Sequence, residues 1–121
     1  MSNTAVSIET APAAISYRHK QGDTWVPDTI TVNSGGTPVD FTGATGSFTF
    51  KNPVSGTTAL TLTTGSGITL SNAGVVTLTM TAAQSAALRL GDFLTELVVV
   101  LASGRKWTIT NGVFEQVDKN L

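Results

Sequence analysis

The chain has 121 residues, a formal net charge of −1 and no cysteine. This length fits one domain that buries a core of its own. So little positive charge argues against nucleic acid as a partner, because nucleic-acid binders need a basic surface. The lack of cysteine excludes disulfides and thiolate metal sites. No stretch has the pattern of a signal peptide or the length of a membrane span, so we expect no membrane partner.

Hydroxyl-bearing and small residues dominate the chain. Serine and threonine account for 31 residues and glycine for 12, which favours an all-β domain. No charged residue occurs between Lys51 and Arg89. Such a segment is typical of a surface that faces another protein, although threonine and serine also solvate a free surface well. Both interpretations stay open.

Residues 1–14 have weak periodicity, and Val6 and Ile8 are their large apolar residues after Met1. This pattern predicts an N-terminal tail. The alternative is an arm that orders on a neighbouring molecule, where Val6 and Ile8 would add a strand to another sheet.

Residues 15–117 are predicted to form the folded domain. Short apolar alternations predict strands near 15–20, 24–33, 44–50, 60–63 and 68–70, with turn residues between them. Pro27 interrupts the second of these, so that part is expected at an edge or a bulge.

The segment 75–102 organises the rest of the prediction. Val76 opens an alternation of apolar residues with threonines that is typical of a half-buried strand. Thr81 and Gln84 have the spacing of a capping box, which predicts one short helix over about 82–90 that Gly91 ends. The run 93–101 is the most apolar of the chain, and we expect a central strand buried on both faces.

A last hairpin arm is expected to close at Val117, and residues 118–121 are predicted to be a C-terminal tail. The spacing of about eight short strands and their turns predicts an all-β, immunoglobulin-like β-sandwich with one short helix before the central strand. No linker divides the chain.

Residues that could carry chemistry are sparse. His19 is the single histidine, so neither a nucleophilic site nor a transition-metal site is favoured, and an enzyme using His19 is the weakest hypothesis. Asp23 with Asp28, and Asp92 with Glu96, are pairs of carboxylates for which structural roles fit better than hydrolysis. We expect no catalytic residue, no cofactor and no metal ion.

Aromatic and basic residues offer the remaining candidates. Two tryptophans could stack on a sugar, although they more often fill a core or an interface. Three consecutive residues form a basic cluster that could bind an acidic neighbour or simply end a solvated strand. With the two apolar residues of the N-terminal segment, the candidate partner-binding residues are Val6, Ile8, Arg18, His19, Lys20, Trp25 and Trp107.

Several motifs follow one another in a recognisable order along residues 20–117. They are GDTW at 22–25, VDFTGA at 39–44, SGITL at 66–70, VTLTMTAAQ at 76–84, a short helix ending at LGD (90–92), and a strand followed by a turn at Gly104 and Arg105. Together they resemble a family of small tailed-bacteriophage virion domains with an immunoglobulin-like sandwich. The N-terminal domain of phage baseplate upper proteins belongs to that group.

The resemblance implies a non-enzymatic structural protein located in the virion. Its partners would be other virion proteins, either the major capsid protein or tail and baseplate proteins, with a homo-oligomer as a further option. Baseplate upper proteins continue into long helical regions that anchor receptor-binding proteins, whereas this sequence stops at Leu121. The prediction is therefore a capsid decoration (cement) protein that binds in many copies. The alternatives are a small tail or baseplate component and a carbohydrate-binding module.

Overall fold

The computed structural model describes residues 3–118, which form ten strands, a 3-10 helix (η1) and one short α-helix. In chain order these elements are β1 (Asn3–Ser7), η1 (Ile8–Thr10), β2 (Ala13–Lys20), β3 (Thr29–Ser34), β4 (Thr37–Pro38), β5 (Thr45–Lys51), β6 (Thr58–Thr64), β7 (Gly67–Leu70), β8 (Val75–Leu78), α1 (Ala82–Ala87), β9 (Gly91–Val100) and β10 (Lys106–Val117).

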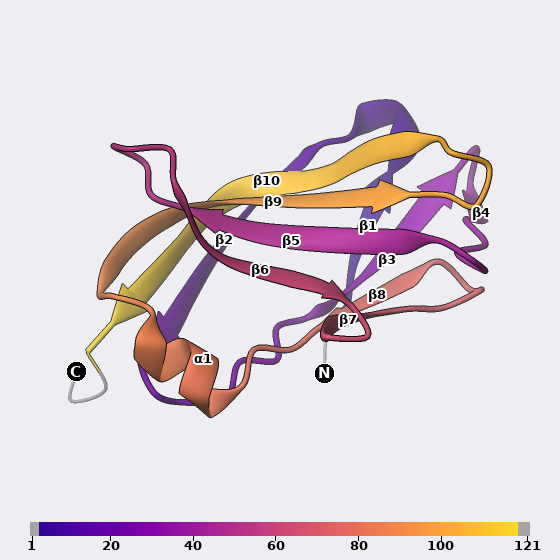
Figure 1. Cartoon of the computed structure of the whole chain (residues 1–121). Helices are drawn as coiled ribbons and strands as arrows, with labels where there is room; N and C mark the ends of the chain where they lie inside the picture. The colour runs from indigo at the N-terminus through magenta and orange to yellow at the C-terminus, as the bar shows by residue number, and fades with distance from the viewer. Residues whose placement is uncertain (1–2, 119–121) are drawn as a thin grey trace.

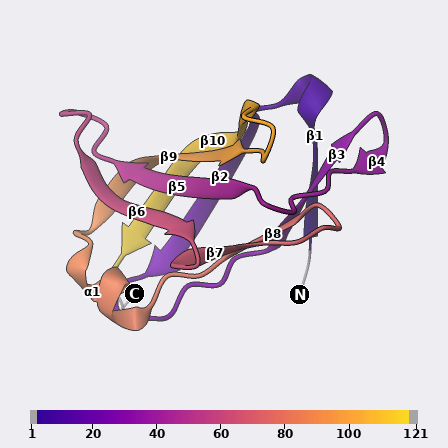
Figure 2. The ribbon, with the colours of Figure 1, turned by 45° about the vertical axis from the view of Figure 1, so that its right-hand side comes forward.

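The strands join into one curved sheet (Figure 1). Its order is β1-β3-β8-β7-β6-β5-β9-β10-β2, with β4 paired to β3. The pairs β1–β3, β6–β7 and β2–β10 are parallel and the others are antiparallel. The sheet curls into a nearly closed barrel (Figure 2). The all-β prediction is confirmed, but one continuous sheet replaces the two separate sheets of the predicted immunoglobulin-like sandwich, because β7 and β8 connect β6 to β3.

Four phenylalanines fill the centre of this sheet. Phe48, Phe50, Phe93 and Phe114 are each fully buried. The rings of Phe50 and Phe114 meet edge to face with centroids 5.0 Å apart, and those of Phe48 and Phe50 are 5.1 Å apart. Such pairs add to the free energy gained by burying the rings. The alternating apolar residues of β5, β9 and β10 thus supply one shared core.

Strand β9 is buried on one face, not on both as predicted. Phe93, Leu97 and Val99 are fully buried, whereas Leu94 between them is 48% exposed. β9 lies in the middle of the sheet between β5 and β10, so its alternate side chains face the outside of the barrel. The outer residues Val98 and Val100 are half-buried, and their β-branched side chains suit the pleated outer surface of the sheet without burial on two sides.

Helix α1 begins where the capping box predicts and ends earlier than predicted. The Gln84 backbone N–H donates to Thr81 Oγ1 at 3.1 Å, and the Thr81 N–H donates to Gln84 Oε1 at 2.9 Å. The helix stops at Ala87 instead of near residue 90, because Leu88 is extended and turns its side chain into the core.

Within residues 3–14, β1 and the start of β2 belong to the sheet and η1 lies between them, so this segment is neither a tail nor a free arm. β1 pairs with β3 from Asn3 opposite Thr29 to Ser7 opposite Asn33, and Val6 is 3% exposed. Ile8 packs against the same core. The weak periodicity of this segment is that of a short strand at the end of a sheet. At the other end of the chain, β10 closes at Val117, and residues 119–121 of the predicted tail lie outside the described residues.

Candidate functional site

The two ends of the sheet face each other across a seam between β1 and β2. Within residues 3–118, β1 has β3 as its strand neighbour and β2 has β10. Such edge strands keep half of their backbone N–H and C=O groups free for another strand. From β1 to β2 along the sheet, five pairs of neighbouring strands are antiparallel and three are parallel. Because the number of antiparallel pairs is odd, β1 and β2 run in opposite directions.

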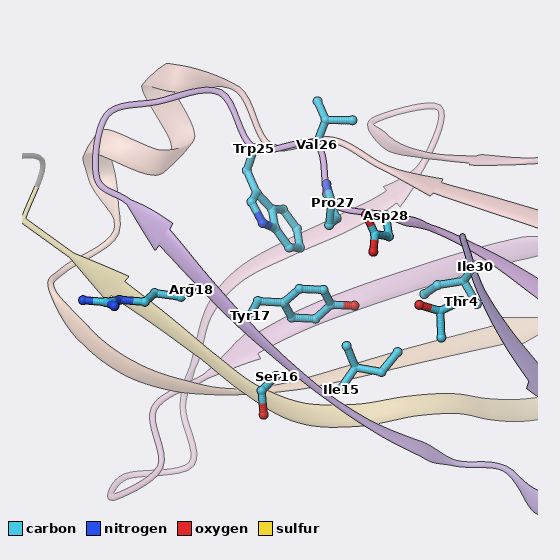
Figure 3. A pocket seen from close by; sticks show the side chains of 10 residues that line it. All are labelled: Thr4, Ile15, Ser16, Tyr17, Arg18, Trp25, Val26, Pro27, Asp28 and Ile30. Carbon is cyan, nitrogen blue, oxygen red and sulfur yellow. The ribbon is translucent and has the colours of Figure 1, made fainter. Parts of the chain in front are cut away.

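A cleft of about 370 Å³ lies along this seam, and we call it the seam cleft (Figure 3). One side is β2, from Ile15 to Arg18, and the other is formed by Thr4 of β1 and Ile30 of β3. The loop 25–28, which leads into β3, completes the lining. Pro27 interrupts pairing in this loop, as the sequence predicts, and a single bridge from Trp25 to Met80 ties it to the sheet.

Tyr17 and Trp25 form the aromatic part of the lining. Their ring centroids are 5.1 Å apart at an interplanar angle of 88°. Trp25 is 5% exposed. Its backbone N–H donates to the Met80 carbonyl, and its backbone carbonyl accepts from the Met80 N–H, both at 2.9 Å. Burial, helped by the nearby negative charge of Asp28, raises the pKa of Tyr17 to about 12. The phenol therefore stays protonated and able to donate at neutral pH.

The buried Trp25 contradicts the sugar-stacking hypothesis. Its indole packs against five other aromatic rings in and around the core, those of Tyr17, His19, Phe48, Phe50 and Phe114. Trp107 lies near the start of β10 opposite Val99 and is partly buried against the core. A platform for a pyranose needs exposed aromatic faces, so a pair built on Trp25 does not provide one.

Two charged residues line the seam cleft, and they differ in their surroundings. The Arg18 Nε lies 3.6 Å from the Glu115 carboxylate on β10, and its side chain extends away from the cleft (Figure 3). Asp28 is exposed and turns its carboxylate toward Tyr17. Among residues 3–118 no ion pair or hydrogen bond engages the Asp28 carboxylate. The uncompensated charge of the cleft is therefore negative.

The structure divides the predicted basic cluster between the two faces of β2. Arg18 and Lys20 are exposed, while His19 faces inward and is half-buried. The His19 Nε2 lies 2.8 Å from the Asp23 carbonyl oxygen, and its ring packs 6.0 Å from that of Phe114. The imidazole is thus engaged with backbone and core rather than with a serine.

Sequence reasoning missed the seam cleft because it took β1 for a tail. One signal was present: Ile15, Tyr17 and His19 alternate along a strand without glycine or proline. In the described part of the chain, no group of three acidic or histidine side chains could hold a metal ion. No helix there is long and apolar enough to cross a membrane.

Comparison with solved structures finds the same architecture in a phage protein. The N-terminal domain of phage TP901-1 ORF48 aligns with 96% of this chain and 98% of that chain, with a TM-score of 0.57 and 12% sequence identity. The chain shares its fold with a phage baseplate domain. This confirms, at the level of the fold, the predicted resemblance to a baseplate N-terminal domain. No family model matches the chain, and no curated protein matches its sequence.

Proposed function

We propose that this protein is a non-enzymatic structural component of a tailed-phage virion and that it assembles in the tail or baseplate. The supporting observation is the fold shared with the ORF48 domain over 96% of this chain and 98% of that one. Near-complete coverage in both directions means that no large insertion separates the two domains. A baseplate position therefore now has more support than capsid decoration, which the sequence favoured.

The uncharged segment 52–88 supplies the surface proposed to contact neighbouring virion proteins. It contributes β6, β7, β8 and α1, and the three strands are consecutive neighbours in the sheet (Figure 2). Thr58, Thr61 and Thr63 on β6 are exposed. Hydroxyl groups form hydrogen bonds across an interface without the desolvation cost of charges. Many copies of one modest contact on a symmetric particle would hold firmly together.

Fractionation of phage particles tests this proposal. Heads and tails are separated on a gradient, the protein is quantified in each fraction by mass spectrometry, and an antibody to it is localised on intact particles by electron microscopy. We expect the protein in the tail fraction and the label at the tail end distant from the head. Recovery with heads would favour the capsid decoration hypothesis instead, and absence from purified particles would refute a virion role.

A further inference from the structure

We propose that the seam cleft binds an extended segment of a partner protein, which adds a strand beside β2 and places a lysine or arginine side chain at Asp28. The fold comparison does not suggest this site. The inference rests on the free edges of the sheet, on the lining of the seam cleft and on its charge. It is independent of where in the virion the protein sits.

The edge of β2 is suited to receive a strand. β2 has eight residues, with neither a proline nor a glycine to interrupt pairing. Its inward side chains Ile15 and Tyr17 are only half-buried, whereas the inward residues of the central strands are fully buried. Charged side chains protect edge strands from unspecific pairing. On β2 they occur at Arg18 and Lys20, so the half from Ala13 to Ser16 remains uncharged.

The floor of the seam cleft would accept alternate apolar side chains of such a segment. Ile15 and Tyr17 of β2, Trp25 of the loop and Ile30 of β3 line it. Val26 lies at the rim and is 47% exposed. Peptides that add to a sheet edge gain affinity from backbone hydrogen bonds and specificity from side-chain pockets. The side of the incoming strand that faces the cleft would therefore be apolar.

The charge of the seam cleft selects a basic residue within that segment. Arg18 is already compensated by Glu115, while the Asp28 carboxylate faces the cleft without a counter-ion among the described residues. A cation placed there would meet the Asp28 carboxylate (Figure 3). A glutamate or aspartate at the same place would face a like charge.

A synthetic peptide serves as the probe. The sequence acetyl-Thr-Val-Thr-Lys-Thr-Val-Thr-amide places two valines and the lysine on one side of an extended chain. Titration into the isotopically labelled full chain is followed by amide chemical shifts. We expect shifts concentrated at residues 13–18, at 25–28 and on β1. A peptide with glutamate in place of lysine should have an affinity at least about threefold lower, in keeping with the loss of an exposed ion pair.

Two variants and two modified peptides separate the parts of the proposal. Asp28→Asn should weaken the lysine peptide about threefold, while Asp23→Asn, an exposed carboxylate outside the cleft lining, should leave binding unchanged. One peptide is N-methylated at the threonines and the other at the two valines and the lysine. Each loses the backbone N–H donors along one edge of the extended chain. At least one of them should lose binding.

Three results would overturn the proposal. Absence of shifts at millimolar peptide, or shifts confined to other surfaces, would refute the site. Full binding of both methylated peptides would refute strand addition, and an unchanged affinity in Asp28→Asn would refute the basic side chain. Shifts of the cleft amides on dilution of the protein alone would assign the cleft to a second copy of this chain. None of these results bears on the particle fractionation, so the two proposals fail separately.

Discussion

Gly112 determines how closely β2 approaches β10. It pairs with Ile15 in the parallel ladder, and a Cβ at this position would collide with the Ile15 backbone, with the carbonyl carbon at 2.7 Å and the nitrogen at 2.9 Å. Backbone atoms on a paired strand cannot move aside without breaking the ladder. Glycine is therefore required here for close approach and not for a special backbone angle.

Gly112→Ala is expected to lower the free energy of unfolding by about 1–3 kcal/mol, the range of an overpacked site. The control is Gly46→Ala on β5, where a Cβ would make ordinary contacts of 3.6 Å with Ile68. Urea denaturation of both variants measures the difference. Equal stability of the two variants would contradict this account of β2.

Glu9 of η1 fastens the N-terminal segment to the turn after β3. Its carboxylate accepts hydrogen bonds from the Gly35 N–H at 3.0 Å and the Ser7 hydroxyl at 2.8 Å, and its other oxygen accepts one from Ser34 at 3.1 Å. The Gly35 N–H contributes most, and together these donors hold the pKa of Glu9 below its ordinary value of 4.5. Hydrogen bonds to the charged form have this effect.

The lowered pKa predicts a pH-dependent contribution of Glu9 to stability. The contribution is fully present above the ordinary pKa of 4.5 and is lost as the pH falls below it through the lower pKa of the folded state. Glu9→Gln should therefore have a lower melting temperature than the wild type at neutral pH. The gap should narrow on acidification below 4.5, as measured by circular dichroism. A gap that is independent of pH would show that the carboxylate charge does not contribute.

Helix α1 is docked by two glutamine amides, one buried and one half-buried, as well as by packing. The Gln116 Nε2 of β10 donates to the Ser85 carbonyl at 2.6 Å, and the Gln21 Nε2 donates to the Leu88 carbonyl at 2.8 Å. The Ser85 hydroxyl accepts from the Gly22 N–H at 2.9 Å. Gln116 and Ser85 are 1% and 0% exposed. Helix, loop and last strand therefore share one polar network.

Gln116→Met keeps the length of the side chain and removes its donor. We expect a loss of about 0.5–1.5 kcal/mol in the free energy of unfolding, because the Ser85 carbonyl loses one hydrogen bond and keeps the one from the Leu88 N–H. Glu115→Gln on the exposed side of the same strand should change it by less than about 1 kcal/mol. Hydrogen exchange of the α1 amides checks the mechanism, since loosening should concentrate there. Unchanged exchange in Gln116→Met would argue against this docking role.

Elements specified by neighbouring residues were predictable, and those specified by distant pairing were not. The capping box at Thr81 and the alternation of β5 depend on residues a few positions apart, so the sequence reveals them. The pairing of β1 with β3 and of β2 with β10 joins segments far apart in sequence and is parallel, and it leaves no local turn signal. The seam cleft lies between these two strands, so it too was invisible to local patterns.

The whole molecule has an uneven distribution of charge. Its 15 Lys, Arg, Asp and Glu residues all lie outside 52–88, and pairing of β6, β7 and β8 turns that uncharged stretch of sequence into an uncharged area of the barrel. The sequence shows that segment 52–88 lacks charged residues, but it did not predict that β6, β7 and β8 are neighbours in the sheet. The seam cleft, which contains Asp28, lies where the first and last strands of the sheet, β1 and β2, face each other, whereas β6, β7 and β8 lie inside the strand order. The two proposed contact surfaces should therefore respond differently to salt.

Attachment through the uncharged surface is expected to withstand high salt. At about 1 M salt the Debye length falls to ~3 Å, which screens exposed ion pairs but not hydroxyl hydrogen bonds or apolar contacts. Particles washed in such a buffer should keep the protein at full occupancy, measured by quantitative mass spectrometry after sedimentation, while binding of the lysine peptide to the seam cleft should weaken. Thr61→Lys on β6 should lower occupancy by placing a charge in the interface, whereas Asn111→Lys on the outer face of β10 should not. Release of the protein by salt alone would show that charged residues outside 52–88 make the attachment.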